Sequence, residues 1–337
     1  MDKRLRIPFT VLNEALCRAL SKLGFDDDDA SICARLFTNT TCDGVYSHGL
    51  NRFPRFVRMI ENGSIDVHAK PELVAAVGSL ERWNGHRAAG NVNAHKCMDR
   101  ALALARESGI GCVALAQTNH WMRGGSYGWQ AAEAGMIGLC WTNTLQNLPP
   151  WGATEPRVGN NPLVIAVPRV GGHVVLDMAI SQFSFGALES YRERGEQLPV
   201  TGGFDAAGQL TRDPAAIEAS GRVLPIGFWK GSGLALVLDM IAAMLSGGLA
   251  THQISSDPES ETGISQSFIA MNFTALDQDG EGQRLADRII DHLHLATTEG
   301  MPVRYPGQRT LQIRTENYAI GIPVDPAIWT DVCALAN

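Results

Sequence analysis

The segment from Asp43 to Phe56 holds the residues best suited to chemistry. His48 lies between two small residues, Ser47 and Gly49, that leave its ring unshielded, and Arg52 follows four positions later. Residues four apart share one face of a helical turn, so we expect the two side chains to lie together. A titratable imidazole beside a permanently charged guanidinium suits proton transfer to an acidic carbonyl compound. The alternative, that Ser47 caps a helix while His48 and Arg52 are solvated, stays open on these residues alone.

Two further segments could contribute to the same site. His120 follows a buried apolar strand and precedes Trp121, and sites are often assembled where strands end. Lys230 stands among small residues just before an apolar helix, where free backbone N–H groups favour phosphate or ribose. Alternatively, His120 is a structural residue, and Lys230 lies along the surface without binding a ligand. Together with His48 and Arg52, these residues favour an enzyme that acts on a small anionic molecule.

The common signatures of other site classes are missing. The sequence contains no G-x-G-x-x-G after a strand, no phosphate-binding G-x-x-x-x-G-K-[ST] and no G-x-S-x-G. His292 and His294 are two apart and point to different helix faces, which makes a poor chelate. We therefore expect no metal site, no P-loop and no Rossmann-type nucleotide site.

Composition narrows the class of protein. The 337 residues carry a net charge of −7 with acids and bases interspersed, which predicts neither nucleic-acid nor membrane partners. The charged start, Met1 to Arg6, is unlike a signal peptide. Seven cysteines form no C-x-x-C pair, and an odd number of thiols is typical of a reducing compartment. We expect a cytoplasmic protein.

Hydrophobic periodicity predicts a helical start followed by mixed strands and helices. The expected helices are 8–23, 26–42, 53–62, 91–107, 130–134, 184–194 and 231–246, and the expected strands are 73–77, 80–84, 110–116, 137–142, 163–168, 174–178 and 267–273. Residues 198–228 read as a loop. No regular βαβ rhythm is present, so the predicted class is α+β: a mixed or antiparallel sheet of non-Rossmann type with a helical domain. The expected division is 1–70 helical, 71–280 sheet, and 281–337 mostly helical and packed on the first part.

Six segments together resemble the type-2 malate/L-lactate dehydrogenase family. They are Val45–Phe56, Asn119–Gln130, Cys140–Asn143, Pro149–Ala153, Gly159–Pro162 and Trp229–Gly233. The resemblance extends from about residue 8 to residue 335. It implies a nicotinamide-dependent reductase of 2-oxo acids that lacks a Rossmann fold and forms a homodimer, with NADH reducing the C2 carbonyl of 2,3-diketo-L-gulonate.

The resemblance makes His48 the proton donor, which agrees with the chemistry inferred above, because hydride addition to a ketone leaves an alkoxide that needs a proton. Arg52 would bind the substrate carboxylate bidentately, and His120 would hydrogen-bond the reacting or neighbouring oxygen. The implied cofactor contacts are His173, Val174, Val175, Leu176, Asp177, Met178, Ala179, Trp229, Lys230, Gly307, Gln308 and Arg309.

Some alternatives remain open at this stage. Gln308 and Arg309 stand where the family commonly has an acidic residue, and an arginine there favours a 2′-phosphate, so NADP is the alternative cofactor. The substrate could instead be a malate- or lactate-type oxoacid or a cyclic imino acid. A non-catalytic sugar-acid binding protein is the alternative from another functional class.

Overall fold

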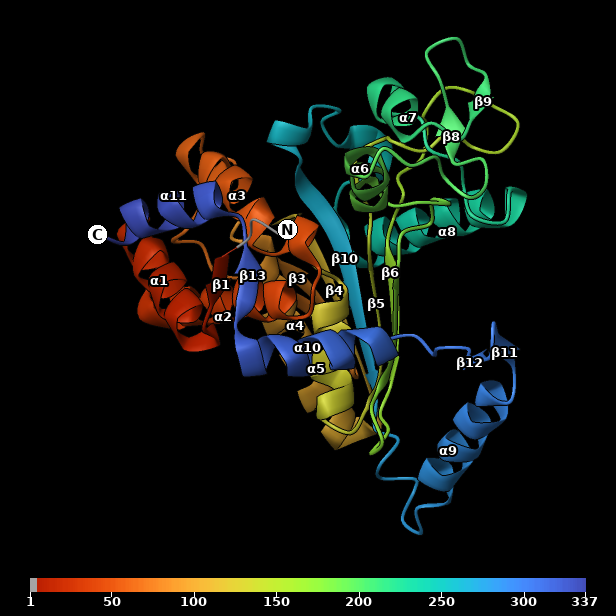
Figure 1. Ribbon diagram of the computed structural model, residues 1–337. Coiled ribbons are helices and arrows are strands. Elements are labelled where there is room, and N and C mark those ends of the chain that lie inside the picture. The colour runs from red at the N-terminus through yellow and green to blue at the C-terminus, as the bar shows by residue number, and fades with distance from the viewer. Residues whose placement is uncertain (1–4) are drawn as a thin grey trace.

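The computed structural model describes residues 5–337 and is built around a seven-stranded sheet with the strand order β2-β3-β4-β10-β5-β6-β7 (Figure 1). The strands are β2 (Glu72–Val77), β3 (Leu80–Asn84), β4 (Ile110–Asn119), β5 (Ile137–Thr142), β6 (Leu163–Val167), β7 (Val174–Met178) and β10 (Thr262–Met271). β3 and β4 pair in parallel, and every other neighbouring pair in this sheet is antiparallel. The mixed, mostly antiparallel sheet of the prediction is confirmed.

Helices cover both faces of this sheet (Figure 1). α4 (Gly90–Ser108) and α5 (Gly125–Glu133) pack on one face, where Val113 and Leu115 of β4 join an apolar cluster with Met98. α8 (Trp229–Ser246) packs on the other face, and Trp141 of β5 donates its indole N–H to the carbonyl of Leu238 at 3.1 Å. Because successive strand residues point to opposite faces, the sheet contributes to two separate cores.

A helical layer forms from both ends of the chain. α1 (Phe9–Lys22), α2 (Asp27–Cys42) and α3 (Phe53–Glu61) pack with α11 (Pro326–Ala336), and β1 (Leu5–Ile7) pairs antiparallel with β13 (Ile322–Val324). Their shared core is aromatic and aliphatic, with Leu12, Leu16, Phe37 and Phe56 almost completely buried. The Asp26 side chain accepts the N–H of Asp29 and so caps α2. The first and last segments are therefore joined by both packing and strand pairing.

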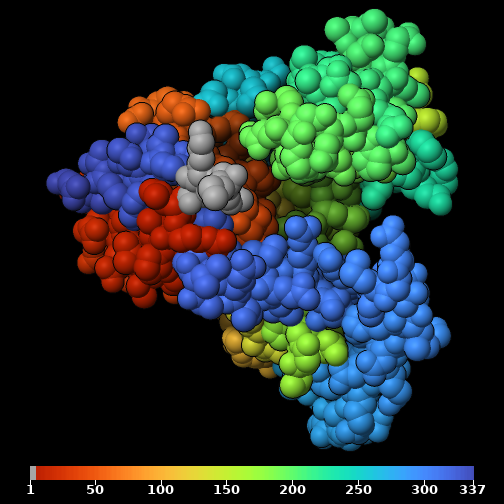
Figure 2. Space-filling model, viewed as in Figure 1, coloured from red at the N-terminus to blue at the C-terminus, as the bar shows by residue number. Residues whose placement is uncertain are grey.

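Two peripheral parts complete the fold (Figure 2). Between β7 and α8 lie α6 (Phe185–Glu193), the short pair β8 (Gly203–Phe204) and β9 (Leu210–Thr211), and α7 (Pro214–Ser220). After β10 come α9 (Glu281–His294), the pair β11 (Thr297–Thr298) and β12 (Met301–Pro302), and α10 (Gln308–Ile320). α9 contacts the turn between β6 and β7, where Arg169 binds Asp287 at 2.6 Å. Helix α10 returns the chain to the N-terminal helices, as Figure 1 shows.

The structure corrects four predicted elements. α5 begins at Gly125 rather than 130, because its glycine-rich first turn obscures the helical pattern. β10 begins at Thr262 rather than 267, and the polar residues at its start are paired inside the sheet, with Ser265 N–H donating to Asn143 at 2.8 Å. The predicted loop 198–228 contains α7, which Asp213 caps. His48 and Arg52 lie in two separate 3-10 turns, Tyr46–His48 and Leu50–Arg52, rather than in one helical turn.

Candidate active site

A cavity of about 880 Å³ lies where the 3-10 turns of the helical layer meet the ends of the sheet strands. It is lined by residues from the segments 45–55, 120–124, 144–162, 177–189, 218–221 and 256–261. Pockets for small organic ligands span roughly 300–1,000 Å³. This cavity therefore has room for a small acid and for part of a second, larger ligand.

The two 3-10 turns present His48 and Arg52 to this cavity. The chain bends at Gly49, where an added Cβ would lie 2.5 Å from the Thr41 hydroxyl oxygen, so only glycine fits. The same Thr41 oxygen accepts the N–H of Leu50 at 2.9 Å and fixes the second turn against α2. The helical turn expected from the spacing is absent, yet the bend still directs both side chains into one cavity.

His120 reaches the same cavity from the end of β4. The side chain of Asn119 donates to the carbonyls of Arg87 and Ala88 at 2.7 and 3.0 Å and so anchors the strand end. Nδ1 of His120 accepts the N–H of Met122 at 3.0 Å, which places the proton of the neutral ring on Nε2. The rings of His48 and His120 stack with centroids 5.8 Å apart. The structure thus brings together the three residues predicted to be catalytic.

Both histidines have lowered pKa values and are therefore neutral at pH 7. Burial, Arg52 and Arg123 lower the pKa of His48 to about 4. Burial is also the main reason that the pKa of His120 lies well below its usual range, with Arg52 and His48 adding to the effect. A bound anion would offset the positive charge of Arg52 and thereby raise both pKa values.

The guanidinium of Arg52 has no hydrogen-bond or ion-pair partner among residues 5–337. Burial and the neighbouring Arg55 lower its pKa to about 10. Arg55 lines the cavity too, but its guanidinium is bound to Glu259 at 3.2 Å and to the carbonyl of Pro258. Buried arginines are normally paired. Arg52 is therefore the cation of this cavity that is free to take a carboxylate.

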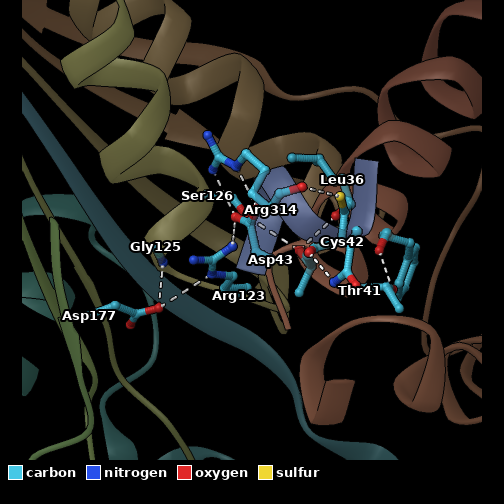
Figure 3. Close-up of polar contacts among 12 residues, drawn as sticks. Leu36, Thr41, Cys42, Asp43, Arg123, Gly125, Ser126, Asp177 and Arg314 are labelled. Carbon is cyan, nitrogen blue, oxygen red and sulfur yellow. Dashed lines mark hydrogen bonds and ion pairs between the residues drawn. The ribbon is translucent and has the colours of Figure 1, made fainter. Parts of the chain in front are cut away.

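A buried ion-pair network fixes the opposite wall (Figure 3). Asp43, at the end of α2, binds Arg123 and also receives two hydrogen bonds from Arg314 of α10, at 2.6 and 2.8 Å. Nε of Arg123 lies 4.0 Å from the carboxylate of Asp177, which accepts the N–H of Gly125 at 2.8 Å. Burial raises the pKa of Asp177, and Arg123 opposes this shift. The network joins α2, α5, α10 and the end of β7 behind the cavity.

The predicted cofactor contacts divide into two groups. Asp177 and Ala179 line the cavity, while His173, Val174, Val175, Leu176 and Met178 continue along β7, the edge strand of the sheet. Gly307, followed by Gln308 and Arg309, packs on this strand: Val175 donates its N–H to the carbonyl of Pro306 at 3.0 Å, and a Cβ at Gly307 would lie 3.2 Å from Val175 N. We call β7 together with the start of α10 the β7 patch; its side chains alternate between the two faces of the sheet, with Val175 in one apolar cluster and Met178 against another.

Trp229 and Lys230 are not part of this patch. They begin α8 and do not line the cavity, and the Trp229 side chain is 67% exposed. The buried Nε of Arg123, by contrast, has no hydrogen-bond partner among the described residues and lies at the cavity wall beside Asp177. An unpartnered donor and a large cavity next to β7 fit a second ligand, such as a nicotinamide cofactor, at this edge of the sheet.

Sequence reasoning missed two cavity residues. Arg123 stands in a recognisable segment, but nothing in its spacing reveals that it is buried against Asp43. Glu261 follows Asp257 and Glu259 in a stretch that resembles a solvated acidic loop, yet it is only 5% exposed and lines the cavity. No pattern in the sequence distinguishes Glu261 from these neighbours.

The chain is similar to known proteins over nearly its whole length. Residues 7–333 match the model of the malate/L-lactate dehydrogenase family. A 2,3-diketo-L-gulonate reductase from Shigella boydii is 47% identical over 333 residues, covering 98% of this chain and all of that protein.

Two solved structures have the same fold. Sulfolactate dehydrogenase from Methanocaldococcus jannaschii is 27% identical with a TM-score of 0.90, covering 99% of this chain and 97% of that one. A Δ1-piperideine-2-carboxylate reductase from Pseudomonas syringae is 25% identical with a TM-score of 0.88, covering 98% and 99%. With a family match over nearly its whole length, this chain belongs to the malate/L-lactate dehydrogenase family and is an oxidoreductase.

Proposed function

We propose that the protein uses NADH to reduce the C2 carbonyl of 2,3-diketo-L-gulonate to 3-keto-L-gulonate. The observation that carries the proposal is the unpartnered guanidinium of Arg52 in the same cavity as the stacked His48 and His120. Relatives 47% identical to this chain are named for this substrate. A carboxylate bound bidentately by Arg52 would determine which carbonyl of the diketo acid meets the histidines.

His48 is the proton donor in this proposal. Its pKa is about 4, because burial and two arginines disfavour the imidazolium. A substrate carboxylate bound to Arg52 cancels part of this positive field, which raises the pKa and lets His48 carry a proton near neutral pH. His120, with its proton on Nε2, would donate a hydrogen bond to the reacting or neighbouring oxygen.

The bound dihydronicotinamide would supply the hydride to the carbonyl carbon. Asp177 and Ala179 at the cavity, with the β7 patch and Gly307 to Arg309, would hold the cofactor. This site belongs to a sheet with one parallel strand pair rather than to a doubly wound parallel sheet. NADP is the alternative cofactor, because Arg309 is exposed in the first turn of α10.

The oligomeric state and cellular location form part of the proposal. We propose a homodimer that buries the exposed apolar face of α8, where Leu236, Val237, Met240 and Met244 are each about half exposed or more. Such a contiguous apolar surface is typical of a protein interface. A cytoplasmic location accords with seven cysteines that are all free thiols.

The test is NADH oxidation, followed by absorbance, with 2,3-diketo-L-gulonate and a panel of unhydroxylated 2-oxo acids. We expect turnover selective for the diketo acid. Preferential turnover of pyruvate or oxaloacetate would instead show that the substrate is a malate- or lactate-type oxoacid. The same panel with NADPH decides the cofactor. No turnover with any acid and either cofactor would refute the proposal.

A further inference from the structure

Glu261 is a buried carboxylate that faces the cavity with few partners. It precedes β10, is 5% exposed, and lines the same cavity as Arg52 and His48. Its hydrogen bond within the described part of the chain comes from the backbone N–H of Leu145, 3.1 Å from Oε1. A carboxylate can accept about four hydrogen bonds. Most of the accepting capacity of Glu261 is therefore unused.

Four other buried carboxylates among the described residues each have at least two side-chain or backbone partners. Asp43 binds two arginines, Asp29 binds two lysines, and Glu81 accepts from Arg100 and from the indole N–H of Trp83. Asp239 accepts from the Asn143 side chain and the Thr251 N–H. These four show how the fold normally stabilises a buried acid, and Glu261 is unlike them.

The nearby arginines do not supply the missing partners. Arg55 is bound to Glu259 and to the carbonyl of Pro258. Arg52 attracts Glu261 through space but forms no ion pair with it within 4.0 Å. Burial accordingly raises the pKa of Glu261, and the N–H of Leu145 and the two arginines offset only part of the shift. Among residues 5–337, this cavity thus contains a cation without an ion-pair partner and a carboxylate with a single hydrogen-bond donor.

A single ligand with a carboxylate and a hydrogen-bond donor would satisfy both groups. We propose that Glu261 determines specificity by accepting a hydrogen bond from a substrate hydroxyl, so that the cavity selects hydroxylated carboxylic acids over unhydroxylated acids of equal length. A site built to bind a hydroxyl discriminates strongly against the analogue that lacks it, because the buried acceptor is then left unpaired. This inference deepens the proposed function and rests on it for the identity of the reaction.

A cationic nitrogen of a ligand is the other group that could donate a hydrogen bond to Glu261. A cyclic imino or amino acid would present an N–H to Glu261 while its carboxylate bound Arg52. Ser184 and Ser256 also line the cavity, and their hydroxyls suit a chain with several hydroxyl groups better than an apolar ring. We therefore commit to the hydroxylated acid, and the nitrogen ligand becomes an outcome of the test.

The experiment measures binding by calorimetry to the NADH-saturated enzyme. The probes are L-gulonate and hexanoate, which share chain length and carboxylate but differ in hydroxyl groups, together with pipecolate as a cyclic amino acid. The variants are Glu261→Gln, which keeps the shape, and Glu261→Asp, which keeps the charge but withdraws it by one methylene. Asp257→Asn is the matched control: it lies on the same loop, is exposed, does not line the cavity, and caps the next turn through the N–H of Glu259.

We expect Glu261→Gln to weaken L-gulonate at least tenfold while hexanoate stays within twofold of the wild type. Glu261→Asp should give the same selective loss, and it carries the test if the Gln variant fails to fold by circular dichroism. Asp257→Asn should leave the ratio of the two affinities unchanged. An equal change for both acids, an unchanged L-gulonate affinity, or a selective loss of pipecolate would overturn the inference. Selective loss of L-gulonate without turnover of the diketo acid would refute the proposed function and leave this inference standing.

Discussion

At the scale of single residues, the cavity pairs two neutral histidines with one free arginine. His48 and His120 stack at 5.8 Å, and Arg52 lowers the pKa of both. Both rings are neutral at pH 7 because their pKa values are lowered, whereas general-acid chemistry needs a protonated ring. In the proposed mechanism, a substrate carboxylate bound to Arg52 would raise the pKa of His48 and so favour its protonated form.

Replacing the proton donor tests its role directly. We expect His48→Gln to lower kcat for the diketo acid by about 10²–10⁴-fold, the range for loss of a general acid. NADH binding, followed by its fluorescence, should be unchanged because His48 is not one of the predicted cofactor contacts, which lie along β7 and at the starts of α8 and α10. A kcat near that of the wild type would show that another group supplies the proton.

The low pKa of His48 also predicts an acid-dependent loss of stability. Its pKa is about 4 when folded and about 6.5 when unfolded, so the unfolded state binds more protons between these values. The contribution is intact above pH 6.5 and is lost as the pH falls toward 4; the loss is at most about 3.5 kcal/mol, at roughly 1.4 kcal/mol per pKa unit. Urea unfolding across this range should show a weaker pH dependence for His48→Gln than for the wild type. Parallel curves would contradict this account.

At the scale of elements, close backbone contacts set the position of the His120 loop. α4 begins at Gly90, where an added Cβ would lie 2.0 Å from the carbonyl oxygen of Asn119 and 2.5 Å from that of His120. Neither backbone oxygen can move without shifting the end of β4. The first turn of α4 thus holds a catalytic segment that is 30 residues away in sequence.

Substituting this glycine should affect stability and activity together. We expect Gly90→Ala to destabilise the protein by about 1–3 kcal/mol, the usual cost of overpacking, and to reduce kcat/KM by displacing His120. Gly233→Ala in α8 is the matched control, because its Cβ would meet nothing within 4 Å, and removing a helical glycine stabilises by about 0.5–1 kcal/mol. Thermal unfolding and steady-state kinetics measure both. Equal melting temperatures for the two variants would rule out the steric argument.

At the scale of the whole molecule, α8 presents an unusual surface. It is long and apolar enough by composition to cross a membrane, but a core helix of a soluble protein passes the same test, and a third of it is buried against the sheet. Its opposite face is apolar and exposed. A second copy of the chain packed on this face would remove that surface from water.

We therefore expect the wild type to sediment as a dimer and Met240→Glu/Met244→Glu to sediment as a monomer. Two charges placed in an apolar interface would be buried without partners, which strongly disfavours association. Analytical ultracentrifugation makes the measurement, with Leu276→Glu as a control because Leu276 is exposed elsewhere on the molecule. A wild-type monomer, or a dimer that survives both glutamates, would refute this interface. Flotation with lipid vesicles would indicate a membrane role instead.

Much of the fold follows from local sequence patterns. The three N-terminal helices and β2 to β7 lie within a few residues of their predicted ranges, because apolar periodicity, caps and terminal glycines act over short distances. Other elements differ from their predicted ranges because contacts between distant residues stabilise them. Gly125 begins a helix that packing stabilises, and polar residues at the start of β10 are accepted because Asn143 pairs with Ser265 across the sheet. The local pattern of apolar and polar residues cannot predict such contacts between distant residues.

The sequence by itself determined which residue types could do the chemistry, namely His48, Arg52 and His120, because their character does not depend on the fold. Only the tertiary structure decided that these residues share one cavity and that the Arg52 side chain has no partner among residues 5–337. It also decided that Asp177 lines this cavity while Trp229 and Lys230 do not. The sequence around Glu261 resembles a solvated acidic loop, and only the tertiary structure shows that its carboxylate is buried. The physical reason is that burial and unsatisfied hydrogen bonds are set by chain segments more than 100 residues apart, which meet only when the sheet and the helical layer close around the cavity.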